Sequence, residues 1–191
     1  MHTAGPLQRA ALWITILLLL SSCSIFPWEK TREREPGVVS ETARQAQQQF
    51  ALGRYDKALE IYSSAYDKHH DAELRRGYAK IGEQIRAAAD ASYRGGNFAE
   101  AGTAYENLFD SGITTRDFAQ TLSFDDDYLT GKIKACSNQL LEIGLMKYRE
   151  EKIEEALAVW KKALVFDADN RTIKNAIDTA TAQLQQLKSL K

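Results

Sequence analysis

Residues 148–164 read YREEKIEEALAVWKKAL, and the same arrangement of aromatic and small residues occurs twice more in the chain. The other copies are FALGRYDKALEIYSSAY at residues 50–66 and YRGGNFAEAGTAYENLF at residues 93–109. Each copy has an aromatic residue, then an aromatic residue or isoleucine five positions later, an alanine three after that, and another aromatic residue four after the alanine. Such internal similarity predicts stacked copies of one supersecondary unit.

The spacing within each copy predicts a helical hairpin. Ala58, Ala101 and Ala156 each share a helical face with the residues four and seven positions later. A small side chain there lets two helix axes approach closely. The turns that precede these helices are Gly53-Arg54, Gly95-Gly96-Asn97 and Glu151-Lys152. We therefore expect an all-α fold of hairpins, each with an apolar face that the next hairpin covers.

The pattern resembles the tetratricopeptide repeat (TPR), whose second helix carries an alanine and then an aromatic residue four positions later. In the third copy Leu140, Ile143 and Gly144 stand where that family has its tryptophan, leucine and glycine. The alanines are 43 and then 55 residues apart, against a repeat of about 34 in the family, and no copy has the family's terminal proline. The resemblance implies a right-handed TPR-like solenoid with about three irregular repeats and about seven helices.

The sequence also predicts the structure of the long intervals between the repeats and of the residues after the third repeat. The first interval is expected to lengthen a helix that runs from Asp71 to Arg94, and the second to insert residues 111–127, with a short helix near 116–122. Apolar residues keep helical spacing from Ile173 to Leu187, after an N-cap at Asp169-Asn170. This C-terminal helix supplies the polar outer face that a repeat array needs at its end.

The N-terminal residues carry a different signal. Residues 10–20 are apolar except for Thr15, and this run of 11 residues is too short to span a membrane but is typical of a signal peptide. The next residues complete the tetrad Leu20-Ser21-Ser22-Cys23, which resembles the lipobox of bacterial lipoproteins. The resemblance implies that Cys23 becomes an acylated N-terminus, and two or more acyl chains give stable anchoring. An uncleaved anchor or an N-terminal core segment is the alternative.

These patterns divide the chain into three parts. We expect a lipoprotein signal peptide at residues 1–22, a lipidated N-terminus and flexible tether at residues 23–38, and the TPR-like domain at residues 39–191. The tether contains two prolines and charges of both signs. By analogy with enteric lipoprotein sorting, a serine rather than an aspartate after Cys23 favours the periplasmic face of the outer membrane.

Composition narrows the function. Without residues 1–22 the chain keeps 24 basic and 26 acidic residues, and this balance gives no support to nucleic-acid binding. If Cys23 is acylated, Cys136 has no partner, which excludes a disulfide framework.

Few residues suggest chemistry. Cys136 lies on an apolar helical stripe, which favours an inert buried thiol over a reactive one. His69-His70-Asp71 could bind a metal, but no second ligand pair is spaced for it, so a turn with Asp71 as a helix cap is favoured. Residues 125–127 are three aspartates without calcium-loop spacing, and they suit the first turn of a helix. With no catalytic motif visible, we expect no enzyme activity, no metal and no cofactor.

The surface of the first helix of each hairpin is the remaining candidate. In the TPR family these helices line a concave groove, and the resemblance nominates as partner-binding residues Gln47, Arg86, Asp90, Arg94 and Arg149. Arg86, Asp90 and Arg94 are spaced four residues apart and form one polar stripe able to engage a peptide. A solvated face with internal ion pairs is the alternative.

Three functions follow from these expectations. The first is a lipid-anchored periplasmic adaptor that binds protein partners in a cell-envelope assembly, secretion or pilus-type machine. The second is a structural subunit of such a machine, or a self-associating envelope protein. The third, an enzyme accessory at the cell wall, has no residue to support it.

Overall fold

The computed structural model describes residues 37–189, and all regular structure in this part of the chain is helical. The α-helices are α2 (Val38–Ala51), α3 (Tyr55–His69), α4 (Ala72–Arg94), α5 (Phe98–Asp110), α6 (Asp126–Arg149), α7 (Ile153–Phe166) and α8 (Arg171–Ser189). Two short 3-10 helices, η1 (Ile113–Thr115) and η2 (Ala119–Thr121), lie between α5 and α6. The predicted all-α fold with about seven helices is confirmed for these residues. The signal peptide, Cys23 and nearly all of the tether lie outside them.

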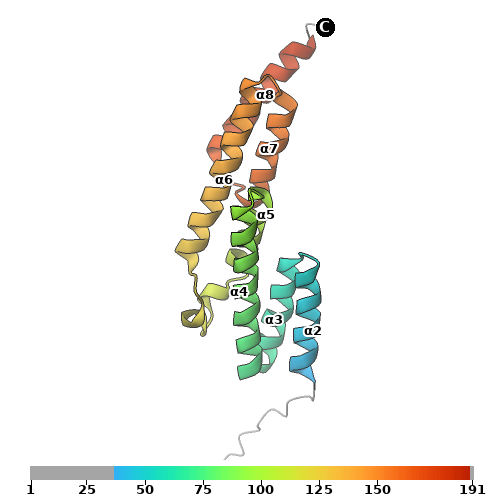
Figure 1. The fold of residues 1–191 in the computed structure, drawn as a ribbon, viewed down its shortest axis with the longest axis vertical. Coiled ribbons are helices and arrows are strands. Elements are labelled where there is room, and N and C mark those ends of the chain that lie inside the picture. Colours follow the sequence, from blue (N-terminus) through green and yellow to red (C-terminus); the bar gives the residue numbers. More distant parts are fainter. Residues whose placement is uncertain (1–36, 190–191) are drawn as a thin grey trace, which may run out of the picture. The chain divides into compact units, whose positions relative to one another are not determined.

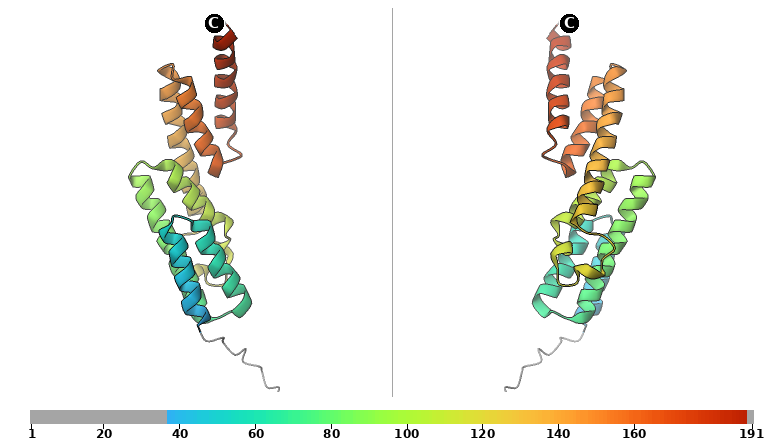
Figure 2. Two further views of the ribbon diagram at one scale, coloured as in Figure 1. Left: turned by 90° about the vertical axis from the view of Figure 1, so that its right-hand side faces the viewer. Right: turned by 90° about the vertical axis from the view of Figure 1, so that its left-hand side faces the viewer.

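Neighbouring helices in the chain pack against each other (Figures 1 and 2). Helices α2 and α3, α4 and α5, and α6 and α7 form three hairpins. Each hairpin also contacts the next element, because α3 packs on α4, α5 on α6, and α7 on α8. The second helices, α3, α5 and α7, also contact one another in turn. The prediction of consecutive helical hairpins is therefore confirmed.

The three hairpin turns have the same backbone geometry. Each repeat begins with an aromatic residue, and the residue three positions after it has a left-handed backbone conformation. The φ angle is 71° at Gly53, 79° at Gly96 and 61° at Glu151. The N–H of this residue donates to the carbonyl of that aromatic residue, at distances of 2.9, 3.1 and 3.0 Å. The following residue donates to the carbonyl five positions earlier, at 2.9 to 3.0 Å, in all three turns. The repeat in the sequence is therefore a repeat in the backbone.

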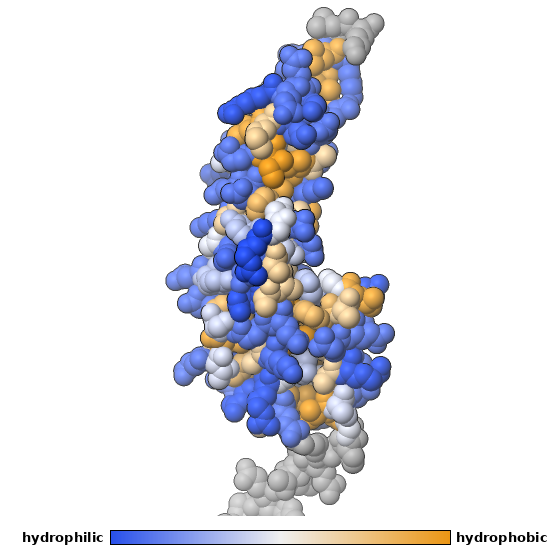
Figure 3. Space-filling view, viewed as in Figure 1, coloured by the Kyte–Doolittle hydropathy of each residue, from blue (hydrophilic) through white to orange (hydrophobic). Residues whose placement is uncertain are grey.

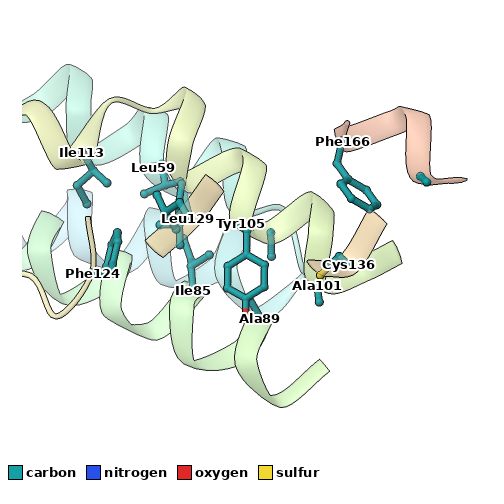
Figure 4. Packing of buried hydrophobic residues seen from close by; sticks show 14 of the residues in the cluster. Leu59, Ile85, Ala89, Ala101, Tyr105, Ile113, Phe124, Leu129, Cys136 and Phe166 are labelled. Carbon is teal, nitrogen blue, oxygen red and sulfur yellow. The ribbon is translucent and has the colours of Figure 1, made fainter. Parts of the chain in front are cut away.

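The repeat positions form the core. Ala58, Ala101 and Ala156 are each 0% exposed, as their spacing predicts. The aromatic residues four positions later, Tyr62, Tyr105 and Trp160, are buried beside them. Figure 4 shows Ala101 and Tyr105 among side chains from several helices that pack into one cluster. Because interiors pack as tightly as organic crystals, the small alanines set how closely the helices approach.

Polar side chains cap the N-termini of α4, α6 and α8. The Asp71 carboxylate accepts hydrogen bonds from the N–H groups of Glu73 at 2.7 Å and Leu74 at 3.2 Å, so it caps α4 as predicted. Asp125 caps α6 through the N–H of Tyr128 at 2.8 Å. Of the predicted pair Asp169-Asn170, it is Asn170 that caps α8, because its Oδ1 accepts from the N–H of Ile173 at 3.1 Å.

The insertion after α5 contains a short helix within the expected range of residues 116–122, but this is the 3-10 helix η2 and not a helix over the whole range. Arg116 is extended, with φ −74° and ψ 158°, and it separates η1 from η2. Its guanidinium binds Asp67 and, at 2.6 Å, the Ser63 hydroxyl on α3. The next residue, Asp117, accepts a hydrogen bond from the Tyr66 hydroxyl at 2.8 Å. These attachments to α3 hold the segment in a shape that a continuous helix does not allow.

Candidate functional site

Asp90 on α4 is the centre of a polar network that joins α4, α5 and α6. Its carboxylate accepts hydrogen bonds from the hydroxyls of Tyr105 at 2.5 Å and Tyr128 at 2.7 Å. It also forms ion pairs with Arg86 at 2.5 Å and Lys132 at 3.5 Å. Burial acts to raise the pKa of Asp90, but the two tyrosine hydrogen bonds and the two positive charges outweigh it and lower the pKa. Asp90 is therefore a charged, fully partnered group.

Lys132 on α6 completes this network with its ammonium group over aromatic rings. The Nζ atom lies 5.3 Å from the ring centre of Tyr93, 5.9 Å from that of Tyr105 and 5.3 Å from that of Tyr128. Cation–π attraction strengthens as such a group loses water. The side chain of Lys132 is 31% exposed, so it closes the network toward solvent.

Glu83 extends the network to the inserted segment. Its carboxylate accepts from the N–H of Ser123 at 2.5 Å and from the Ser123 hydroxyl at 2.7 Å. It also accepts from Arg86 Nε at 3.0 Å. Burial acts to raise the pKa of Glu83, but the hydrogen bonds from Ser123 and Arg86 lower it overall. One face of α4 thus holds both α6 and the segment that leads to it.

The predicted polar stripe divides into two parts. Arg86 and Asp90 are brought together and bind each other, which favours the alternative of internal pairing for these two residues. Arg94 is exposed at the end of α4, and among the described residues it has no ion pair or side-chain hydrogen bond. Gln47 on α2 and Arg149 on α6 are likewise exposed and unpaired within residues 37–189. The structure does not bring these three into the network around Asp90.

A cleft of about 330 Å³ lies between the second helices, α3, α5 and α7. Its lining includes Tyr55, Ala99, Ala104 and Val165, together with four polar residues. These polar residues are Glu100, Thr103, Asn107 and Lys162. Val165 is 65% exposed although it is a large apolar residue. The face of the molecule shown in Figure 3 is mostly hydrophilic, with small apolar patches scattered over it.

Two parts of these sites are not evident from the sequence. Tyr128 and Lys132 are four residues apart on α6, a spacing that places them on one face, but their partner Asp90 lies on another helix. Val165 follows Leu164 at the end of the third repeat and reads as one more core residue. The signal that could have found it is its spacing from Ala156, because nine residues are two and a half helical turns and place Val165 on the side of the helix opposite the repeat's apolar face.

The cysteine and histidine residues considered for chemistry lie in the core or at a turn. Cys136 is 0% exposed, and burial raises the pKa of its thiol to about 11. His70 adopts a left-handed conformation after α3, in the turn that leads to the Asp71 cap. Within residues 37–189, no group of three or more histidine, cysteine, aspartate or glutamate side chains is arranged to hold a metal ion.

The helices of residues 37–189 include none that is both long and apolar enough to cross a membrane. Comparison of the chain with protein-family models and with curated proteins finds no match in either set.

Proposed function

We propose that this chain is a lipid-anchored adaptor of the cell envelope whose TPR-like domain binds protein partners. The anchor is the acylated Cys23, and the location is the periplasmic face of the outer membrane. The partner is a component of an assembly, secretion or pilus-type machine. Support for the anchor comes from the lipobox-like tetrad Leu20-Ser21-Ser22-Cys23, and support for the TPR-like domain comes from the three equivalent hairpins.

The cleft between α3, α5 and α7 is the observation that carries the binding proposal. Its lining brings apolar residues together with charged and amide ones, and protein interfaces likewise combine an apolar centre with a polar rim. A volume of about 330 Å³ accepts one or two apolar side chains. Val165 is 65% exposed in the free chain, and its burial by a partner contributes up to about 1.5–3 kcal/mol.

The polar stripe on α4 contributes to this function indirectly. Because Arg86 and Asp90 are bound to each other, they stabilise the hairpins and leave Arg94 as the exposed charge of the stripe. We therefore assign the partner contact to the cleft around Val165 rather than to the α4 stripe.

The test places a photo-crosslinking benzophenone amino acid at position 165 of the full chain in its native cell envelope. A matched control places the same amino acid at Met146, which is 52% exposed on α6 and does not line the cleft. We expect one defined envelope protein to crosslink at position 165 and not at position 146. Equal crosslinking at both positions, or none at 165, contradicts the assignment.

A second measurement uses the partner that this experiment identifies. Val165→Asp introduces a charge at the cleft, and Met146→Asp makes the same change outside it. We expect Val165→Asp to weaken binding of the purified partner at least tenfold, which corresponds to about 1.4 kcal/mol. Met146→Asp should leave the affinity unchanged.

A further inference from the structure

A second cleft, of about 430 Å³, lies between the first half of α4 and the inserted segment that contains η2. Three basic residues of α4 line it: Arg75, Arg76 and Lys80. All three are exposed, and Arg76 and Lys80 are four residues apart, a spacing at which like charges on a helix repel each other. The cleft shares no residue with the one around Val165. It is therefore a separate surface with a concentration of positive charge.

The acids beside these cations are bound elsewhere. Asp71, four residues before Arg75, caps the start of α4. Glu83, three residues after Lys80, accepts hydrogen bonds from the inserted segment and from another arginine of α4. Asp117 lines the cleft from the inserted segment and accepts a hydrogen bond from a tyrosine of α3 at 2.8 Å. Although Glu83 and Asp117 also line the cleft, Arg75 and Lys80 form no ion pair among residues 37–189.

The donors of the cleft suit an oxyanion such as a phosphate. Within residues 37–189, Arg76 has a single ion pair, with Glu73 at 3.9 Å, and both side chains are exposed, so this pair is weak. A guanidinium binds phosphate through two parallel N–H groups, and a lysine ammonium binds it as a point charge. Gln120 on η2 lines the cleft from the inserted segment and adds an amide group. The two arginines and the lysine therefore offer unused N–H donors along one cleft.

The cleft lies at the end of the domain where the chain enters α2. Helices α2 and α3 form a hairpin, so the start of α2 at Val38 and the end of α3 at His69 lie at the same end. Helix α4 starts at Ala72, three residues later, and also packs on α2. Figure 1 shows the starts of α2 and α4 at this end. Arg75 and Arg76, in the first two turns of α4, therefore lie at the end of the domain that is joined to the proposed anchor.

We propose that this cleft binds the phosphate group of an anionic phospholipid in the membrane that holds the anchor. The guanidinium groups of Arg75 and Arg76 and the ammonium group of Lys80 donate to the phosphate oxygens, and the amide of Gln120 donates from the inserted segment. Basic residues next to a membrane anchor are attracted to a surface of anionic lipids, and salt screens this attraction. The membrane as the source of the phosphate rests on the proposed anchor at Cys23, whereas the affinity of the cleft for phosphate does not.

The first experiment measures whether the cleft lies at the lipid surface. The acylated full chain is placed in nanodiscs of phosphatidylcholine, alone or mixed with phosphatidylglycerol, that also contain a lipid with a nitroxide quencher on its headgroup. A fluorophore at Ala72→Cys reports on the start of α4, and one at Ala182→Cys on α8 is the matched control. Cys136 is 0% exposed and does not compete for the label. We expect phosphatidylglycerol to increase quenching at position 72 and not at position 182, and added salt to abolish the increase.

Variants of the chain locate the contact. Changing the three basic residues of the cleft to glutamine should remove the effect of phosphatidylglycerol at position 72. The control makes the same change at Lys161, Lys162 and Arg171, which are exposed basic residues of α7 and α8 outside the cleft, and it should keep the effect. The proposal is overturned if both variants keep the effect or if both lose it.

A second pair of measurements separates a lipid from a free phosphate, and the cleft from the anchor. Inorganic phosphate is titrated calorimetrically into the chain in phosphatidylcholine nanodiscs. If phosphate binds, the glutamine variant does not bind it and phosphatidylglycerol has no effect, the lipid assignment is overturned in favour of a soluble phosphate. If the chain does not enter nanodiscs, the anchor is wrong, and cosedimentation of Cys23→Ser with phosphatidylglycerol vesicles then tests the cleft alone. Equal sedimentation with phosphatidylcholine vesicles would overturn the proposal.

Discussion

Trp160 on α7 packs directly against the backbone of α6 at Gly144. A Cβ atom at position 144 would overlap the indole ring, and the indole N–H donates a hydrogen bond to the carbonyl of Leu141 at 3.1 Å. Trp160 is 1% exposed. In the third hairpin, α6 and α7 therefore approach closely at Gly144 and Trp160. They can do so only because residue 144 has no side chain.

Gly144→Ala should therefore destabilise the chain although alanine favours helix. We expect the free energy of unfolding to fall by about 1–3 kcal/mol, because the indole must move or the helices must separate. Urea unfolding followed by circular dichroism measures this. Gly131→Ala is the matched control on the same helix, since a Cβ there meets nothing within 4 Å. It should raise the free energy of unfolding by about 0.5–1 kcal/mol, and an equal effect of both variants would contradict the packing.

Glu151→Gly should stabilise the third hairpin turn. Glu151 has a φ of 61°, in the left-handed region that Gly53 and Gly96 occupy in the other two turns. Such a conformation costs a residue with a side chain about 1–2 kcal/mol, and the greater freedom of glycine when unfolded offsets part of that gain. We expect a net increase of about 1 kcal/mol in the free energy of unfolding. Glu150→Gly, where φ is −80°, should not stabilise the chain.

Asp90→Asn should weaken the joint between α4, α5 and α6. The asparagine keeps an acceptor for the tyrosine hydroxyls but no longer neutralises Arg86 and Lys132, so we expect a loss of about 1–3 kcal/mol. Asp178 is an exposed acid on α8, so the control Asp178→Asn should change the free energy of unfolding by less than about 0.5 kcal/mol. Equal unfolding curves for the two variants would show that the network adds nothing to stability.

The same variant should change the dependence of stability on pH. Folding lowers the pKa of Asp90, so its contribution is complete above the unfolded value of about 3.9 and is lost as the pH falls through the lower, folded value. The unchanged chain should therefore lose more stability between about pH 5 and pH 2 than Asp90→Asn does. Unfolding midpoints measured across this range test the difference.

Cys23→Ser should abolish lipid labelling and retention in the membrane fraction. The hydroxyl of serine does not replace the thiol that receives the lipid in a lipobox signal. Metabolic labelling with a radioactive fatty acid and fractionation of the cell envelope provide the measurement. If the variant stays in the membrane fraction, the anchor is not the one that we propose.

The repeat pattern predicted the hairpins because it depends on local spacing. Ala58, Ala101 and Ala156 are all fully buried, and Asp71 caps a helix that ends at Arg94, as expected. These features follow from helical periodicity and from capping chemistry, which are encoded within a few neighbouring residues.

The contents of the sites could not be predicted in the same way. Asp90 meets Tyr128 and Lys132 across 38 and 42 positions of the sequence, and only the packing of α4 against α6 brings them together. The polar stripe on α4 was visible, but the sequence does not show whether its partner is another protein or another helix. Likewise, Arg116 determines the course of the inserted segment through contacts with α3 that no local pattern encodes.

The C-terminal helix has a consequence for how the chain opens. Of the 19 residues of α8, only Ile173 and Ala180 are buried, whereas α6 is held on one side by α5 and on the other by α7. Local opening needs least free energy where few apolar contacts must be broken. Amide hydrogens beyond Ala180 should therefore exchange with solvent long before those of α6, so the chain begins to unfold at the end opposite its proposed lipid anchor in the sequence.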